Sequence, residues 1–157
     1  MLTEQLFSAY LGELYGIAFF TAFAEKYSDD KHINKWQKLI LVEQVTARHL
    51  KTGLEKLGIS CPDNSPEMEQ KGAHDAQKWL SLEWPALVDT MASWVEPYAL
   101  KYRHQAQQAR QHSELFQLVQ EHEDAILAFL QGEQSEKTNS QAALDSFLSR
   151  YHHHDNQ

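Results

Sequence analysis

The chain has 157 residues, of which 42% are hydrophobic, and a formal charge of −8, values that suit one domain with its own core. This negative charge argues against a surface for nucleic acid or anionic membranes, because phosphate binding requires clustered lysine and arginine. No apolar run approaches the roughly 20 residues of a membrane span. The first residues lack the basic and apolar regions of a secretory signal, so we expect a cytoplasmic protein that binds neither membrane nor nucleic acid.

Helical periodicity predicts four long helices, and we find no alternating pattern typical of strands. Their approximate ranges are 3–27, 31–57, 85–111 and 113–130. Gly58 after the second is a typical left-handed C-terminal cap, and Gly132 follows the fourth. Pro97 lies inside the third helix. The sequence therefore predicts an all-α protein.

The segments between and after these helices are more polar. Residues 59–72 are rich in Pro, Asp, Asn, Ser and Gly and are predicted to form a loop, followed by a short helix over 74–82. A polar linker over 133–139 precedes a short C-terminal helix that Ser140 caps. The run His152–His154 is interpreted as a frayed tail or a cloning remnant, although such a run can capture zinc or nickel adventitiously.

Loop lengths favour a particular topology. The first and second long helices are joined by only a few residues, as are the third and fourth, so each pair should form an antiparallel hairpin. The connection between the hairpins is long enough to traverse a helix of about 26 residues, or about 39 Å. We therefore expect a four-helix bundle with a long crossover over 1–132, and a separate linker, helix and tail over 133–157. An ordinary bundle with one long loop is the alternative.

Three glutamates stand where leucines would be expected, at the centres of helical apolar stripes. They are Glu13, Glu43 and Glu123. A buried carboxylate is costly unless it is paired, protonated or bound to a metal. Three such residues together indicate a site.

The symmetry of a hairpin predicts which of these residues meet. Glu13 and Glu43 lie about equally far from the first turn, so they should face one another across the core. The residue that lies opposite Glu123, at the same height on the third helix, should fall near 93–100, where Glu96 stands. However, Glu96 projects about 130° from the apolar face of its helix, and only an irregularity at Pro97 would turn it inward.

The stretch LGELYGIAFFTAFAEKY, residues 11–27, resembles the first helix of the ferritin-like di-iron carboxylate superfamily, and the resemblance extends over residues 3–130. In that family the first and third helices each provide one Glu, and the second and fourth each provide Glu-x-x-His. The resemblance implies a ferritin-like four-helix bundle with metal ligands at Glu13, Glu43 and Glu123, and at Glu96 by spacing alone. It also implies bound iron or manganese, oxidoreductase chemistry and a homo-oligomer, with dimers common for this scaffold.

The chain departs from the family motif at both histidines. Thr46 and Ile126 stand three residues after Glu43 and Glu123. His49 and His122 lie about 120° and 100° around their helices from these glutamates, so we expect neither to replace the missing ligand. The alternatives are an altered or vestigial metal site, and a metal-free core in which the carboxyls are protonated and hydrogen-bonded.

Other signals are weaker. Cys61 is the single cysteine, beside Pro62 in the predicted loop, and we expect no catalytic role for it. We find no glycine-rich phosphate loop and no nucleophile elbow, so no nucleotide or organic cofactor is implied. A haem-oxygenase-like protein is disfavoured because no histidine precedes His32 to serve as the iron's axial ligand. A non-catalytic helical module for oligomerisation or partner binding is the alternative function.

Overall fold

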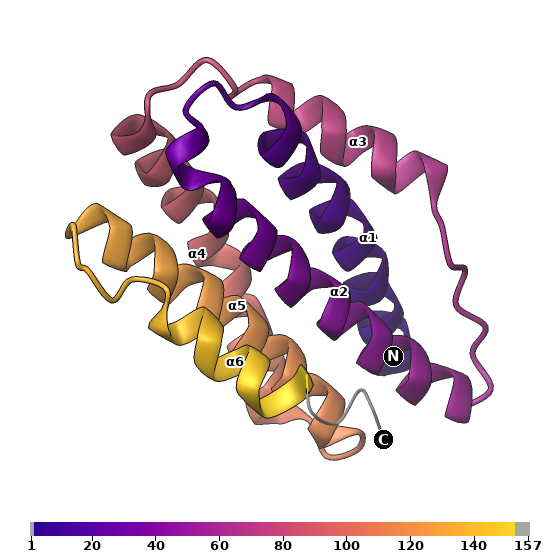
Figure 1. Cartoon of the computed structure of the whole chain (residues 1–157). Helices are drawn as coiled ribbons and strands as arrows, with labels where there is room; N and C mark the ends of the chain where they lie inside the picture. The colour runs from indigo at the N-terminus through magenta and orange to yellow at the C-terminus, as the bar shows by residue number, and fades with distance from the viewer. Residues whose placement is uncertain (1, 153–157) are drawn as a thin grey trace. The chain divides into compact units, whose positions relative to one another are not determined.

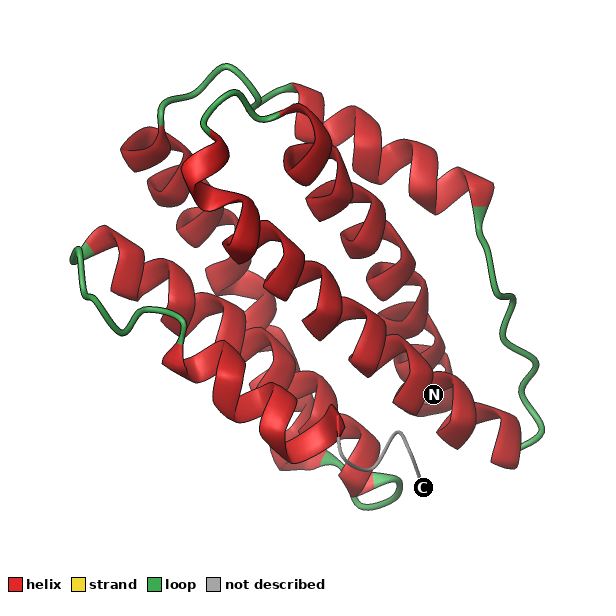
Figure 2. Cartoon of the chain, viewed as in Figure 1, coloured by secondary structure: helices red, strands yellow, loops and turns green. Residues whose placement is uncertain are grey.

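The computed structural model describes residues 2–152, and this range consists of helices joined by loops and turns, with no strand in it (Figure 2). This confirms the all-α class. The helices are α1 (Leu2–Lys26), the 3₁₀ helix η1 (Asp30–His32), α2 (Ile33–Lys56), α3 (Pro66–Gln77), α4 (Trp84–Gln108), α5 (Ser113–Gln134) and α6 (Ala142–His152). Of the histidine run at the C-terminus, only His152 lies within the described residues.

The chain forms two compact units, Met1–Ser81 and Leu82–Gln157. We call them unit 1 and unit 2. This division does not coincide with the boundary expected at residue 132, because α6 packs directly against α5 and belongs to the same unit. Each unit contains one of the two expected hairpins, α1–α2 and α4–α5.

In unit 1, α1 packs against both α2 and α3, which lie on different sides of it (Figure 1). The helix is therefore buried over a wide face that includes Leu6, Phe19 and Phe23. The contact with α3 is close at Gly72, where an added Cβ would lie 2.4 Å from the backbone oxygen of Tyr15.

Among the described residues, α1 is the one helix long and apolar enough to cross a membrane, and 56% of its most apolar window is buried inside the protein. A core helix covered on two sides passes the same criterion as a membrane span. The cytoplasmic location therefore stays a prediction.

Helix α3 was not expected where it stands. The sequence suggested a loop over 59–72 and a short helix over 74–82, whereas the structure has one helix, Pro66–Gln77. The residues interpreted as loop formers are those that begin a helix. Proline occupies the first turn, where its missing N–H is harmless.

A capping box fixes the start of α3. The Ser65 hydroxyl accepts a hydrogen bond from the backbone N–H of Met68, and Glu69 Oε2 accepts one from the backbone N–H of Ser65 at 2.7 Å. This reciprocal arrangement satisfies two N–H groups that a helix end leaves exposed. The pattern Ser-x-x-x-Glu could have been recognised in the sequence as a helix start.

The segment 57–65 connects α2 to α3 and is hydrogen-bonded to both α1 and α2. It begins at the cap that the sequence predicted, with Gly58 in the left-handed region at φ +84°. Lys51 Nζ donates to the carbonyl of Cys61 at 2.7 Å, and the Tyr10 hydroxyl donates to that of Pro62 at 2.5 Å. Cys61 is buried here, and burial raises the pKa of its thiol.

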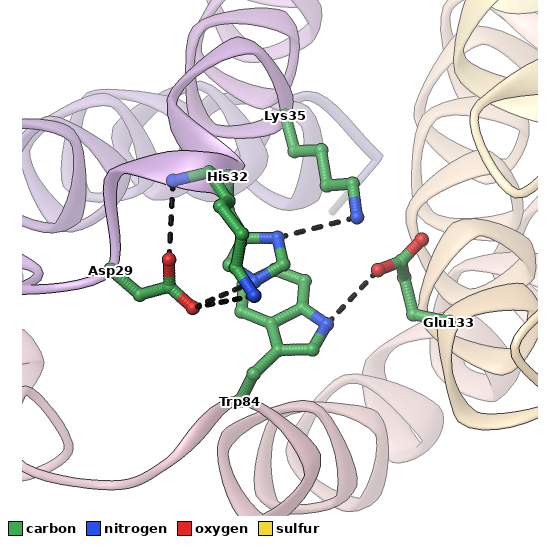
Figure 3. A network of polar contacts seen from close by, with 6 residues as sticks. Asp29, His32, Lys35, Trp84 and Glu133 are labelled. Carbon is green, nitrogen blue, oxygen red and sulfur yellow. Dashed lines mark hydrogen bonds and ion pairs between the residues drawn. The ribbon is translucent and has the colours of Figure 1, made fainter.

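In unit 2, α5 packs against both α4 and α6 (Figure 1). Helix α4 continues through Pro97 without interruption, and α5 extends past Gly132 to Gln134, further than expected. The absence of a side chain at Gly132 lets Ser140 lie close to α5, because an added Cβ would lie only 3.0 Å from Ser140. The next residue, Glu133, accepts a 3.0 Å hydrogen bond from Trp84 Nε1 (Figure 3). It accepts another hydrogen bond from the Ser140 hydroxyl.

Helix α6 is held against α5 by a second glutamate. Glu121 accepts hydrogen bonds from Arg150 Nη1 at 2.6 Å and from the Tyr151 hydroxyl. Phe147 of the same helix packs edge-on against the ring of His122, with centroids 6.0 Å apart. The predicted short C-terminal helix is thus an integral part of unit 2.

Candidate metal centre

Glu13 and Glu43 are the buried acidic pair of unit 1. Glu13 lies on α1 and Glu43 on α2, and their exposed fractions are 4% and 6%. A carboxylate oxygen of each lies within 4.8 Å of one of the other. The prediction that the hairpin brings these two glutamates face to face in a buried position is confirmed.

The close approach depends on the absence of a side chain at Gly16. This residue lies one helical turn after Glu13 on α1 and is buried. An ideal Cβ built on it would lie 2.6 Å from both Cδ and Oε1 of Glu43. The Glu43 carboxylate therefore lies directly against the backbone of α1.

The pair has a clear electrostatic consequence. Two like charges 4 Å apart repel by about 4 kcal/mol at an effective dielectric constant of about 20. Nearby positive charge would compensate this repulsion. A divalent cation supplies that compensation and uses carboxylate oxygens as ligands.

Thr46 stands where the resembled family has a histidine. It is fully buried, three residues after Glu43, and its hydroxyl donates a 2.9 Å hydrogen bond to the carbonyl of Val42. This bond to the preceding turn of its own helix is a common arrangement for threonine. Thr46 therefore does not supply an imidazole-like donor.

The expected centre of the α5 stripe is wrong by one residue. His122 is completely buried, whereas the side chain of Glu123 is 18% exposed. The two side chains are neighbours, with His122 Nε2 3.8 Å from Glu123 Oε1. The buried face of α5 is therefore centred on His122, whose ring also contacts Phe147 of α6.

A signal for this assignment was present in the sequence. Apolar residues flank His122 at the three- and four-residue spacings of one helical face. They are Leu118, Val119, Ala125, Ile126 and Phe129, all of them buried. We expected Glu123 at the centre of this face, so the predicted face was turned by one residue.

Glu96 does not join the buried residues of unit 2. It is exposed on α4, and the proline after it does not rotate it inward. Of the apolar face predicted for this helix, Leu87, Met91 and Val95 are buried, but Tyr98 is 43% exposed. The ligand role expected for Glu96 therefore receives no support from its position.

His32 lies in η1, at the turn between α1 and α2. It is buried, with Nε2 3.4 Å from Asp29 Oδ2 and Nδ1 3.3 Å from the Lys35 ammonium (Figure 3). Asp29 also accepts a 3.2 Å hydrogen bond from the backbone of Lys31. These contacts stabilise the turn that sets α1 and α2 in register.

A cavity of about 420 Å³ also lies in unit 1, between α1, the segment 57–65 and α3. Its lining includes neither Glu13 nor Glu43. Two of its three carboxylates are already engaged, Asp63 with Lys51 at 3.0 Å and Glu69 with the backbone of Ser65. The cavity is thus separate from the acidic pair.

No protein-family model, curated protein or solved structure matches this chain.

Proposed function

We propose that this chain is a ferritin-like helical protein that binds iron or manganese through the carboxylates of Glu13 and Glu43. The observation that carries the proposal is the burial of both carboxylates on adjacent helices, with oxygens within 4.8 Å of each other. Carboxylate oxygens are hard ligands suited to these ions. A divalent ion also balances the two negative charges.

The role of the protein in such a site is to hold and shield the ligands. Helices α1 and α2 are rigid elements, and burial of Glu13 and Glu43 excludes bulk water from their carboxylates. Bound iron or manganese would supply one-electron redox chemistry.

The alternative is a metal-free helical module that acts by oligomerisation or partner binding. Thr46 favours it, since its hydroxyl is bonded to its own helix where the family has a histidine ligand. In that case Glu13 and Glu43 would be compensated by a shared proton or by other protein groups. Chelators would then leave the stability of the protein unchanged.

Metal analysis of the purified protein tests the proposal. The protein is prepared without an affinity column, because His152 and the histidines after it can retain nickel. Anaerobic titration with Fe²⁺, and titration with Mn²⁺, should show at least one equivalent per chain. Glu13→Gln and Glu43→Gln should abolish that binding. Equal uptake by the wild type and Glu43→Gln would exclude the proposal.

Glu96→Gln is the matched control, because it removes the same charge from an exposed position. It should leave the affinity unchanged. The same titration with Glu123→Gln tests the ligand role that the resemblance implies for that residue. A loss with Glu123→Gln would support the ligand role that the sequence predicts for that residue.

A further inference from the structure

We infer that Gly16 is a positioning residue for the Glu13–Glu43 pair: its missing side chain lets the Glu43 carboxylate lie against α1 within reach of Glu13. The metal readout used to test this rests on the proposed function. The geometric claim itself concerns three residues of unit 1 and stands on their contacts alone.

The contact distances leave no room for a methyl group at Gly16. An added Cβ would lie 2.6 Å from Cδ, 2.6 Å from Oε1 and 2.8 Å from Oε2 of Glu43. These values are far below the 3.5–4.0 Å optimum for non-bonded carbon atoms, about 1 Å too short. A side chain and the present carboxylate position are mutually exclusive.

The contact predicts what an alanine would do. The atoms that it would meet are the far end of a flexible side chain, not backbone, so Glu43 can change rotamer while the helices stay packed. The Cα–Cβ bond of a helical residue tilts toward the N-terminus, which here is the direction of Glu13 on the preceding turn. The new methyl would therefore push the Glu43 carboxylate out of the space that the pair shares.

Gly12 offers a matched control in the same helix. It lies one turn before Gly16, and an added Cβ there would meet nothing within 4 Å. Replacing either glycine by alanine gives the helix the same gain in propensity, roughly 0.5–1 kcal/mol. Any difference between the two variants therefore reports the contact with Glu43.

The experiment compares Gly16→Ala, Gly12→Ala, Glu43→Asp and the double variant Gly16→Ala/Glu43→Asp in Mn²⁺ titrations of the full chain. Circular dichroism verifies that each is folded. Gly16→Ala should weaken Mn²⁺ binding by about 10- to 100-fold, the range found when groups that orient metal ligands are removed. Gly12→Ala should bind as the wild type does.

The double variant supplies the decisive comparison. Aspartate is one methylene shorter, so it should bind Mn²⁺ weakly beside glycine but should leave room for the alanine methyl group. Gly16→Ala/Glu43→Asp should therefore bind more tightly than the product of the two single losses predicts. Wild-type affinity in Gly16→Ala, or strictly multiplicative losses, would overturn the inference.

A metal-free measurement separates this inference from the proposed function. If the wild type binds no Mn²⁺, the proposed function fails, and thermal unfolding in EDTA then tests Gly16 alone. The effects of Gly16→Ala and Glu43→Asp on the melting temperature should be non-additive if the residues are in contact. Additive effects would refute the positioning role whether or not metal binds.

Discussion

The hydroxyl of Tyr15 on α1 donates a 2.6 Å hydrogen bond to the carboxylate of Asp75 on α3. The bond joins α1 to α3, two helices that are separated along the chain by α2 and the segment 57–65. The hydrogen bond from Tyr15, more than any other contact, holds the pKa of Asp75 below its usual value. Asp75 therefore stabilises the folded state in its ionised form.

Replacing Tyr15 by phenylalanine should lower the free energy of unfolding at pH 7 by about 1–2 kcal/mol, as for a partly buried hydrogen bond to a charged group. The contribution is fully present above about pH 4, the pKa of an unfolded aspartate, and is lost as the pH falls through the lower folded-state pKa. The difference in the free energy of unfolding between the wild type and Tyr15→Phe should therefore disappear in acid. Urea unfolding at pH 7 and pH 2.5 measures both values.

Tyr98→Phe is the control, since Tyr98 is largely exposed on α4. It should leave the unfolding free energy nearly unchanged at both pH values. A Tyr15→Phe deficit that persists undiminished in acid would show that Tyr15 acts through packing and not through the Asp75 carboxylate.

Bound metal should stabilise the folded state through the Glu13–Glu43 pair. A ligand present at about 100 times its Kd stabilises a protein by about 2.7 kcal/mol, provided that it binds only the folded state. Thermal unfolding with Mn²⁺ and with EDTA measures this difference. Glu43→Gln should melt at the same temperature in both, whereas Glu96→Gln should respond as the wild type does.

The hydrogen bonds from Arg150 and Tyr151 to Glu121 join α6 to α5. Removing the Tyr151 hydroxyl should weaken the packing of α6 on α5. Burial, and then the Glu121 carboxylate, raise the pKa of Tyr151 well above its ordinary value. Burial of Glu121 is outweighed by hydrogen bonds from Tyr151, Gln117 and Arg150, which lower the pKa of Glu121. Tyr151→Phe should therefore increase hydrogen exchange over Ala142–His152 at pH 7.

The ionisation of Glu121 and that of Tyr151 set the lower and upper limits of the pH range in which their hydrogen bond stabilises the protein. Glu121 contributes stability above about pH 4.3 and loses it in acid, because its folded-state pKa is lowered. Tyr151 contributes below about pH 10 and loses it only as the pH rises through its raised folded-state pKa. Ser149→Ala, an exposed change in α6, should leave the exchange rates as they are. Unaltered exchange in Tyr151→Phe would contradict the role of this hydrogen bond.

The N-terminal cap of α3 should also carry measurable stability. Ser65→Ala removes the acceptor for the Met68 N–H and should cost about 1 kcal/mol. Ser60→Ala, in the exposed part of the preceding segment, should cost much less. Urea unfolding of the two variants compares them, and equal midpoints would show that the capping box contributes little.

Local patterns were sufficient to predict the long helices and the Glu13–Glu43 pair. Helix periodicity is a property of neighbouring residues, and a short turn forces two helices to run antiparallel at matched heights. The cap at Gly58 follows from equally local chemistry. The cap expected at Ser140 is wrong, because α6 begins at Ala142 and the Ser140 hydroxyl donates to Glu133. Helix α3 was missed although its start is encoded locally, since Ser65, Pro66 and Glu69 were interpreted as loop residues.

Only the tertiary structure decided which face of each partly amphipathic helix is buried. On α5, apolar residues surround both His122 and Glu123, and the folded protein buries the histidine completely while Glu123 stays partly exposed. The close contact of Gly16 with Glu43 likewise required both helices, since an isolated glycine in a sequence carries no sign of what approaches it. Burial depends on which elements cover a face, and the sequence of one helix does not contain that information.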